Sequence, residues 1–270
     1  MLKVRLLVVT YETAWAEADT LRSLMALTSP GVEMELTIWD NSRASRLDPE
    51  VVARLSGTLG AVKTVHTPEN LALSKIYNTV AAAPGDYDVL VLLDQDTQID
   101  DHYFQTLAGA ADAPAQVFLP IVRSGDLIVS PGSYFLVKGK HWKEARPGLR
   151  PSKDVVAISS GLAVRRAYLE RWPKAFDERM NLYGIDTAFM LDHARREPSV
   201  FVLDHVLQHH TMLWSNPPKA TMLFRFKNLR RARLLMHSRQ PLHFMLALGY
   251  AGVSSLQLAR RYRDLSFLLP

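Results

Sequence analysis

Two acidic residues in the middle of the chain are spaced so that both can bind one divalent cation. Asp94 and Asp96 flank Gln95 and directly follow residues 89–93, an apolar run of Val and Leu. This run is short enough for a strand and too apolar for a strand exposed on either face, so it predicts a central strand of a parallel sheet. Ligands of open α/β sheets bind at the carboxyl ends of the strands. A cation held there by carboxylates completes its shell with water and phosphate oxygens, which predicts a substrate carrying a diphosphate.

Two other roles fit the same carboxylates. Paired acids after a strand are also common as solvated loop residues or helix N-caps, and Asp100 and Asp101 have the position of such a cap. An aspartyl nucleophile of a phosphatase also occupies an Asp-x-Asp after a buried strand. The phosphatase motif has Thr or Val two residues beyond the second Asp, whereas this chain has Gln98 there.

The composition is that of an ordinary folded protein. The chain has 270 residues, 48% of them hydrophobic and 22% charged, which suits one large domain or a domain with a C-terminal appendage. It has no cysteine, which excludes disulfides and thiolate chemistry and fits a cytosolic protein. The N-terminal apolar run is short and lacks a cleavage site, so we expect no signal peptide.

Strand and helix patterns alternate along the first hundred residues. Strands are predicted at 3–10, 32–38, 61–66 and 89–93, and each is followed by a helix, at 18–28, 49–59, 73–83 and 101–111. This order implies right-handed crossovers and a parallel doubly wound sheet. Four polar residues then lie at one edge of the sheet, where the strands end: Thr10, Asp40, Asn70 and Asp94.

The next hundred residues predict a more irregular half of the same sheet. A strand is expected at 117–120 and a Gly- and Pro-rich hairpin insertion at 121–153. A strand at 155–158, a helix at 165–171, a helix at 186–196 and a strand at 200–203 then complete the sheet.

Taken together, these segments resemble family 2 inverting glycosyltransferases of the GT-A fold, and within them the branch of rhamnosyltransferases. The matching stretches occur in order over about the first 230 residues: LLVVTYE, IWDNS, ENLALSKIYN, VLLDQDT, ISSGLAVRRAYL, FDERMNLYGIDTAFML, HH and FRFKN. The resemblance implies a Rossmann-like, mostly parallel α/β sheet flanked by helices. Residues 1–215 would be the nucleotide-sugar-binding catalytic domain and residues 216–270 a C-terminal helical appendage.

The resemblance also implies roles for the residues at the strand ends. The donor would bind to Thr10, Tyr11, Asp40, Asn70, Asp94, Gln95 and Asp96. Asp94 and Asp96, with His209 and His210, would hold Mg²⁺ or Mn²⁺, which stabilises negative charge on the departing diphosphate. His205 is a weaker candidate ligand, and the histidine pair also fits a surface loop. Asp40 fits equally a turn before Asn41.

Two further positions complete the implied site. Ser160 and Gly161 would line the acceptor or sugar pocket, although Gly161 also fits a simple turn. Asp186, at the start of a predicted helix, would be the base that takes the proton of the acceptor hydroxyl, a position that also suits an N-cap. The branch has further acids three residues before and two residues after this position, where this chain has Tyr183 and Ala188. With Tyr183 in place of an acid, the chain lacks a like charge that could raise the pKa of Asp186.

The positive charge of the chain is concentrated in its last fifth. The net charge is +5, and residues 219–239 contain seven Lys or Arg and no Asp or Glu. Interleaved apolar residues make this a basic amphipathic helix. Residues 242–259 approach the length of a membrane span but contain several polar residues. We therefore expect a helical pair that lies on the inner membrane surface; the alternatives are packing on the catalytic domain or on a second subunit.

The sequence thus predicts a metal-dependent inverting glycosyltransferase, cytoplasmic and peripheral on the inner membrane. It would transfer L-rhamnose from dTDP-rhamnose to a glycan or lipid-linked glycan during assembly of a bacterial surface polysaccharide. A hexosyl or galactofuranosyl transferase using a UDP-sugar is the alternative within the class. A non-catalytic nucleotide-sugar-binding module is the alternative outside it. The chain has no recognisable nucleic-acid motif, so we expect no nucleic-acid partner.

Overall fold

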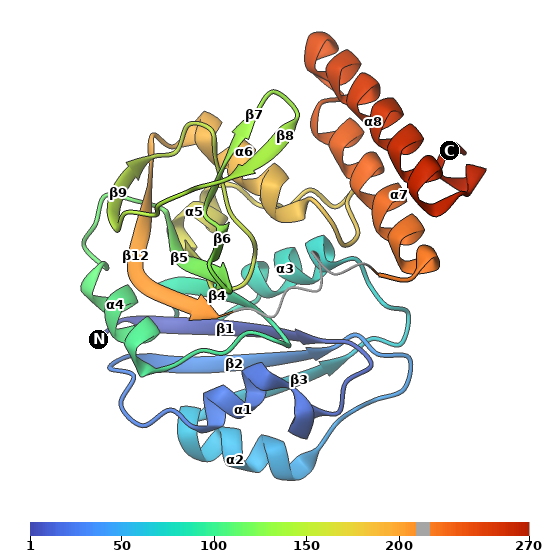
Figure 1. The fold of residues 1–270 in the computed structure, drawn as a ribbon. Helices are drawn as coiled ribbons and strands as arrows, with labels where there is room; N and C mark the ends of the chain where they lie inside the picture. Colours follow the sequence, from blue (N-terminus) through green and yellow to red (C-terminus); the bar gives the residue numbers. More distant parts are fainter. Residues whose placement is uncertain (209–216, 270) are drawn as a thin grey trace.

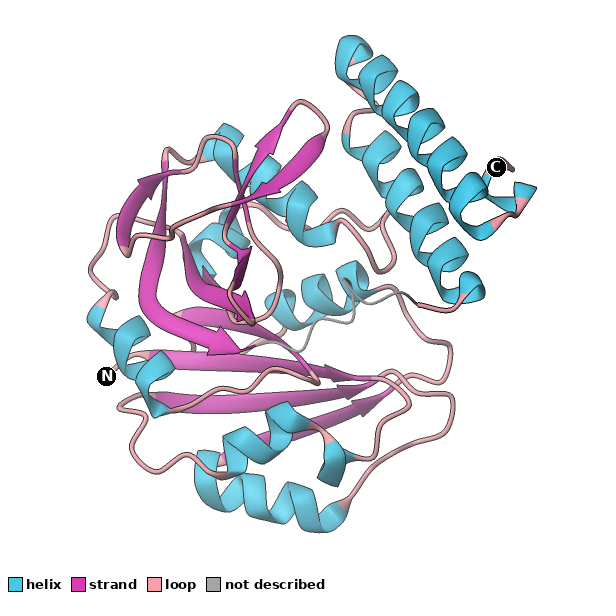
Figure 2. Cartoon of the chain, in the orientation of Figure 1, coloured by secondary structure: helices cyan, strands magenta, loops and turns pink. Residues whose placement is uncertain are grey.

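The computed structural model describes residues 1–208 and 217–269, which form a central sheet with helices on both faces (Figures 1 and 2). The main sheet has the strand order β3-β2-β1-β4-β11-β5-β12-β9, and β6 pairs with β5. A small second sheet has the order β10-β7-β8. The strands are β1 (Lys3–Thr10), β2 (Glu33–Asp40), β3 (Ala61–His66), β4 (Val89–Asp94), β5 (Val117–Ser124), β6 (Leu127–Ser130), β7 (Gly132–Phe135), β8 (Lys138–His141), β9 (Gly148–Pro151), β10 (Val155–Val156), β11 (Leu162–Arg165) and β12 (Ser199–Gln208). The helices are η1 (Trp15–Glu17), α1 (Asp19–Met25), α2 (Pro49–Leu59), α3 (Leu73–Ala82), α4 (Asp101–Gly109), α5 (Arg166–Arg171), α6 (Ile185–Arg196), α7 (Lys219–Met236), α8 (Pro241–Tyr262) and η3 (Leu265–Phe267).

The first half of the sheet is parallel, as the sequence predicts. β1 pairs in parallel with both β2 and β4, and β2 pairs in parallel with β3. The register places Thr10 opposite Asp40, and Asp94 opposite Val9. The polar residues that end β1, β2 and β4 therefore lie side by side at one edge of the sheet.

The second half of the sheet differs from the prediction at one strand. Residues 162–165, expected to lead into a helix, form β11, which lies antiparallel between β4 and β5. The predicted strand at 155–158 is short and belongs to the small sheet instead. Only four residues make β11, so its apolar run is too short to distinguish from the start of the following helix by periodicity.

Helices on both faces bury two apolar layers. On one face, α1, α2 and α4 pack on alternate residues of the central strands, such as Leu6 and Val91. On the other face, α3, α5 and α6 cover the intervening residues, such as Leu7 and Leu92. Because side chains alternate across a strand, apolar residues at successive positions are expected of strands buried on both faces. The predicted α/β fold with flanking helices is confirmed, but the main sheet is mixed, with four parallel and four antiparallel strand pairings in the described part of the chain.

The two C-terminal helices lie side by side and contact the rest of the chain through α7 (Figure 1). Ala232 of α7 joins the apolar layer of α3, α5 and α6. The Arg233 Nε donates to the carbonyl oxygen of Val137 at 3.0 Å, and the Tyr134 hydroxyl lies 3.0 Å from His237 Nε2.

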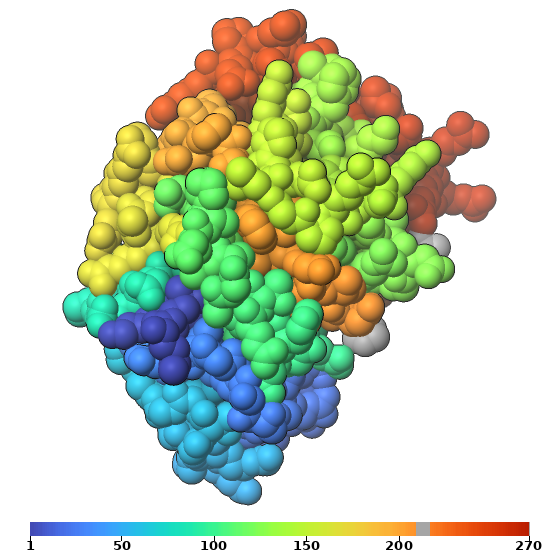
Figure 3. All heavy atoms as spheres, turned by 90° about the vertical axis from the view of Figure 1, so that its left-hand side faces the viewer, coloured from blue at the N-terminus to red at the C-terminus, as the bar shows by residue number. Residues whose placement is uncertain are grey.

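Seen from the left of Figure 1, the blue to cyan N-terminal residues form the bottom of the molecule, and lime to red residues form its top (Figure 3).

One helix among the described residues, α8, is long and apolar enough to cross a membrane by length and composition. Only 22% of its most apolar window is buried. Five of its apolar side chains form an exposed face: Leu242, Met245, Leu248, Val253 and Leu256. The opposite face packs on α7 and η3.

Candidate active site

The loops that follow β2 and β3 are joined by Asn41. Its side-chain amide donates to Asn70 Oδ1 and to the carbonyl oxygen of Leu71, both at 2.9 Å. Its Oδ1 accepts from the Thr67 hydroxyl at 2.8 Å and from the Leu71 N–H at 2.9 Å. This buried side chain therefore makes four hydrogen bonds, and it fixes Asn70, whose φ is 49°, at the edge of the sheet.

Asp40 is buried and organises its own loop. One carboxylate oxygen accepts from the Ser42 N–H at 3.1 Å, and the other accepts from the Arg46 N–H at 2.5 Å. These hydrogen bonds give Asp40 a turn-forming role, which is the alternative to donor binding. Thr10 lies at the same edge of the sheet. In contrast to the Asp40 carboxylate, its buried hydroxyl has no hydrogen-bond partner among the described residues.

The Asp94–Asp96 loop is held by main-chain contacts. The Gln95 Oε1 accepts from the Tyr11 N–H at 2.8 Å, which ties this loop to the end of β1. On the other side, the Thr20 hydroxyl donates to the Asp94 carbonyl oxygen and accepts from the Thr97 N–H at 2.9 Å. These bonds tie the loop to the end of β1 on one side and to α1 on the other. Thr20 was not among the residues singled out from the sequence.

The segment before β11 brings two hydroxyls to Asp94. The Ser160 hydroxyl donates to Asp94 Oδ2 at 2.5 Å, and the Ser159 hydroxyl lies 3.5 Å from the same oxygen. Ser160 is buried, so its side chain supports the carboxylate. Gly161 has a φ of 77°, and a Cβ there would lie 2.6 Å from Leu207 Cδ1. This glycine is required by the turn and by packing.

Asp186 lies in the first turn of α6, as predicted, but it is not the N-cap. The cap is Gly184, with a φ of 79° and no side-chain hydrogen bond. Asp186 instead accepts from the Thr187 N–H at 2.6 Å. The pKa of Asp186 is raised to about 6, mainly by burial and in smaller part by the negative charge of Asp94, while the hydrogen bond from the Thr187 N–H opposes the shift. The chain has no acid at position 183 to raise this pKa, and burial is the main cause of the shift instead.

Tyr77 of α3 links the two carboxylates. It is buried, and burial raises the pKa of its hydroxyl, with further contributions from Asp94 and Asp186 and an opposing one from Ser159. Asp94, at the tip of β4, and Asp186, at the start of α6, thus act on the same phenol. Besides burial, the charge of Asp94 also contributes to the raised pKa of Asp186, so the two carboxylates lie near enough to influence each other.

A cavity of about 250 Å³ opens beside Asp186. One wall comes from Tyr183, Gly184 and Thr187, and the β7–β8 hairpin contributes Tyr134 and Gly139. The third wall is the C-terminal helix α7, through Leu229, Ala232, Arg233 and Met236. A Cβ on Gly184 would lie 2.8 Å from the Ala232 Cβ, so only glycine lets α7 approach this closely. The sequence places a domain boundary before α7 and offers packing of the C-terminal helices on the catalytic domain only as an alternative.

The carboxylates of Asp94 and Asp96 fit a hard divalent cation, because both are oxygen ligands at the end of a buried strand. No group of three or more potential metal-ligating side chains occurs within residues 1–208 and 217–269. His209 and His210 lie outside the described residues. His205 contacts His102, with 3.0 Å between their Nδ1 atoms, and lies 3.6 Å from Asp100. These two partners are separate from the candidate site around Asp94 and Asp186.

Solved structures with the same fold come from several glycosyltransferases. The chain is 16% identical to S. aureus TarS 1-349, with a TM-score of 0.59, covering 91% of this chain and 68% of that one. It is 14% identical to GalNAc-T7 in a complex with UDP, GalNAc and Mn²⁺, with a TM-score of 0.62, covering 98% of this chain and 56% of that one. A mannosyltransferase from Pyrobaculum calidifontis in complex with GDP-Man and Mn²⁺ gives 16% identity, a TM-score of 0.57, and coverage of 94% and 75%.

At such low sequence identities these comparisons establish only the fold, which is GT-A. The chain spans 43% of the longer S. aureus TarS structure. No match is found among curated protein sequences. The sequence profile described as glycosyl transferase family 2 matches residues 6–172, from the first strand to the end of α5. Because this match covers more than half of the chain, the protein belongs to glycosyl transferase family 2.

Proposed function

We propose that this protein is an inverting glycosyltransferase that moves a sugar from a nucleotide diphosphate to a saccharide hydroxyl. The observation that carries the proposal is the coupling of two carboxylates, Asp94 and Asp186, through one buried site. One belongs to the strand edge where a nucleotide sugar would lie, and the other lines a cavity of about 250 Å³. A displacement reaction needs such a pair, with one group near the leaving diphosphate and one near the attacking hydroxyl.

Asp186 is the base of the proposed reaction. With a pKa raised to about 6, it is ionised at neutral pH and yet more basic than an ordinary carboxylate, so it can accept the proton of the acceptor hydroxyl. The hydroxyl oxygen forms a bond to the anomeric carbon while the bond from that carbon to the diphosphate oxygen breaks. The bonding pair leaves with the diphosphate, and attack from the opposite face inverts the anomeric centre.

Asp94 and Asp96 are the residues that would hold a divalent metal, Mg²⁺ or Mn²⁺. When bound, the metal neutralises negative charge that develops on the departing diphosphate. Ser160 keeps the Asp94 carboxylate oriented, and Gln95 keeps the loop against Tyr11. The Mn²⁺ present in complexes of GalNAc-T7 and the Pyrobaculum mannosyltransferase supports this assignment.

For the donor we propose dTDP-rhamnose, with L-rhamnose transferred to a surface polysaccharide. This choice is supported by the rhamnosyltransferase-like order of motifs. A UDP-hexose or UDP-galactofuranose is the second candidate, since S. aureus TarS has been crystallised with UDP and with UDP-GlcNAc.

Thermal shifts with dTDP, UDP and GDP, each with and without Mn²⁺, separate the donor candidates. A nucleotide present at 100 times its Kd stabilises the folded state by about 2.7 kcal/mol. We expect the largest rise in Tm with dTDP and metal; a larger rise with UDP would overturn the rhamnose assignment. If Asp96→Ala and Asp186→Ala both left function unchanged, the protein would be a non-catalytic nucleotide-sugar-binding module.

We also propose that the protein is cytoplasmic and peripheral on the inner membrane, docked through α8. The exposed apolar face of this helix supports the proposal, as does the absence of Asp and Glu from residues 219–263. Co-sedimentation with phosphatidylglycerol vesicles tests it. We expect Leu242→Glu with Met245→Glu to abolish sedimentation, whereas formation of a dimer that the same changes disrupt would indicate an oligomer interface instead.

A further inference from the structure

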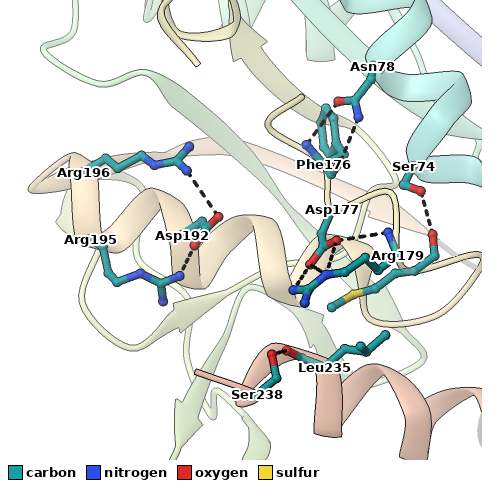
Figure 4. Close-up of polar contacts among 11 residues, drawn as sticks. Ser74, Asn78, Phe176, Asp177, Arg179, Asp192, Arg195, Arg196, Leu235 and Ser238 are labelled. Atoms are coloured by element: carbon teal, nitrogen blue, oxygen red, sulfur yellow. Dashed lines mark hydrogen bonds and ion pairs between the residues drawn. The ribbon is translucent and has the colours of Figure 1, made fainter. Parts of the chain in front are cut away.

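A second cavity, whose lining contains neither Asp94 nor Asp186, lies where α6 meets the turn between α7 and α8 (Figure 4). Its volume is about 770 Å³. One wall is the segment 174–179, another is the α6 face that carries Leu191, Asp192 and Arg195, and the third is formed by residues 235–240. The N-terminal part of α3 contributes Lys75.

Cations exceed acids in the lining of this cavity. Five basic side chains, Lys75, Lys174, Arg179, Arg195 and Arg239, line it together with three acidic ones, Asp177, Glu178 and Asp192.

The three acids already have cationic partners. Arg179 binds Asp177 through two nitrogens, as Figure 4 shows, with 2.6 Å between Nη2 and Oδ2. Asp192 pairs with Arg195 and also with Arg196, which does not line the cavity. Glu178 lies 3.6 Å from Lys174.

Two of the cations, Lys75 and Arg239, make no close ion pair in the described part of the chain, although the positive charge of Arg239 contributes, after the hydrogen bond from Arg179, to lowering the pKa of Asp177. Neither Lys75 nor Arg239 forms an ion pair or hydrogen bond through its side chain within the described residues. Burial lowers the pKa of Arg195, and the positive charges of Arg196 and Arg239 lower it further. Cations are therefore crowded here, and an anion in the cavity would relieve the repulsion between them.

The cavity adjoins the one that contains Asp186. Met236 lines both, and α6 passes from Asp186 and Thr187 in one to Ala188 and Leu191 in the other. Asp186 and Asp192 are six residues apart, which is about 9 Å along a helix. A ligand whose hydroxyl reaches Asp186 can therefore place a charged group among the cations while still bound as one molecule.

An exposed apolar surface begins where the cationic cavity ends. Gln240 lines the cavity, and Leu242, two residues later, is 70% exposed, followed by Met245 at 62%. Cations beside an unpartnered apolar face are complementary to a molecule with an anionic head and a hydrocarbon chain. A soluble oligosaccharide would make no use of the apolar side.

We propose that this cavity binds the phosphate group of a lipid-linked saccharide acceptor, through Lys75 and Arg239, with the hydrocarbon chain along α8. The saccharide then extends past Met236 to Asp186. This assignment rests on the proposed function and narrows its acceptor to a saccharide carried on a lipid phosphate.

Binding of decyl phosphate to the full chain, measured without divalent metal, tests the assignment. Inorganic phosphate supplies the head without the chain, and decyl glucoside supplies the chain with a neutral head. We expect decyl phosphate to bind more tightly than either. Lys75→Ala with Arg239→Ala should weaken its binding about tenfold or more, because charge-assisted hydrogen bonds are the strong ones. Arg54→Ala removes an exposed cation on α2 and should leave binding unchanged.

Three outcomes overturn the assignment. If Asp96→Ala abolishes decyl phosphate binding and the double variant does not, the phosphate binds at the sheet edge instead. If the double variant keeps decyl phosphate binding but loses sedimentation with phosphatidylglycerol vesicles, the two cations contact the bilayer surface. If the three probes bind equally, the cavity does not recognise phosphate. Nucleotide-induced thermal shifts of the same double variant report separately on donor binding at the sheet edge, and we expect them to match wild type.

Discussion

The two sides of the candidate active site are built in different ways. The sheet-edge side consists of loops after β1, β2, β3 and β4, all from the first hundred residues, and each loop is tied to a neighbour by side-chain to main-chain hydrogen bonds. Asn41, Gln95 and Thr20 make these bonds. The Asp186 side consists of the β7–β8 hairpin, the start of α6 and the C-terminal helix α7. It is held by contacts between segments far apart in the chain: close packing of Gly184 on Ala232, and the hydrogen bond from Arg233 to the Val137 carbonyl oxygen.

This difference separates two kinds of function. Hydrogen bonds from fixed main-chain groups hold the sheet edge in one geometry, which suits recognition of a constant nucleotide diphosphate. The opposite wall can change whenever the packing of α7 changes, and it is the wall that faces the acceptor in our proposal. Disturbing one side should therefore leave the other largely intact.

Asp186→Asn gives the largest expected effect. Asparagine keeps the oxygen that accepts from the Thr187 N–H but cannot accept a proton, so we expect turnover to fall about 10²–10⁴-fold. Nucleotide binding, measured by thermal shift, should stay near wild type because the sheet edge is untouched. Asp204→Asn, at an exposed position of β12, is the matched control and should retain full turnover.

The pH profile of wild type sharpens the same assignment. With a pKa of about 6, Asp186 is protonated below that pH, so turnover should fall about tenfold for each pH unit below 6.

The raised pKa of Asp186 affects the stability of the fold in the opposite direction. Because this pKa is higher in the folded than in the unfolded chain, stability falls as pH rises through the interval from about 4 to 6. Asp186→Asn should therefore have a higher Tm than wild type at pH 7.5, and an unchanged Tm would contradict the raised pKa.

Gly184→Ala tests whether packing on α7 shapes the second side. A non-glycine residue at a φ of 79° and a Cβ 2.8 Å from that of Ala232 should together destabilise the fold by about 2–4 kcal/mol. We expect a lower Tm and lower turnover, with nucleotide affinity little changed in the protein that remains folded. Adding Ala232→Gly removes the clash but not the backbone strain, so it should restore part of the loss.

A matched glycine on α8 provides the control for this experiment. A Cβ on Gly249 would meet no atom within 4 Å, so Gly249→Ala should leave Tm unchanged or raise it slightly. Equal losses from Gly184→Ala and Gly249→Ala would show that the close approach of α7 is unimportant.

The same contrast explains what the sequence predicts and what it does not. The strands and helices of the β1–β4 half can be predicted from the sequence. Each strand there is long enough for its pattern of apolar residues to be recognised, and each pairs with a strand close to it in the chain. β11 has four residues and lies antiparallel between two strands, so its identity depends on partners far away in the chain. Local pattern does not contain that information.

Site residues divide in the same way. Motif order placed Asp94 and Asp186 on elements that the fold brings together, but it did not identify Tyr77 as the link between them. Tyr77 lies on the buried face of α3, where a tyrosine is indistinguishable in sequence from a core residue. Packing of α7 on the catalytic domain was only an alternative from the sequence, because Ala232 is a small apolar residue among basic ones and gives no signal of a contact. The raised pKa of Asp186 comes from burial, which only the folded chain reveals.

Asn41→Ala has the smallest expected effect and tests the sheet-edge side. The change removes four hydrogen bonds and leaves the Leu71 N–H and carbonyl oxygen without this partner, so we expect a loss of about 1–3 kcal/mol. The loops carrying Asn70 should loosen, which weakens nucleotide binding while turnover at saturating donor stays near wild type. Asn181→Ala removes an exposed asparagine and serves as the control. A fall in saturated turnover with unchanged nucleotide affinity would reverse the division of labour between the two sides, because it would place the effect of Asn41 on the Asp186 wall.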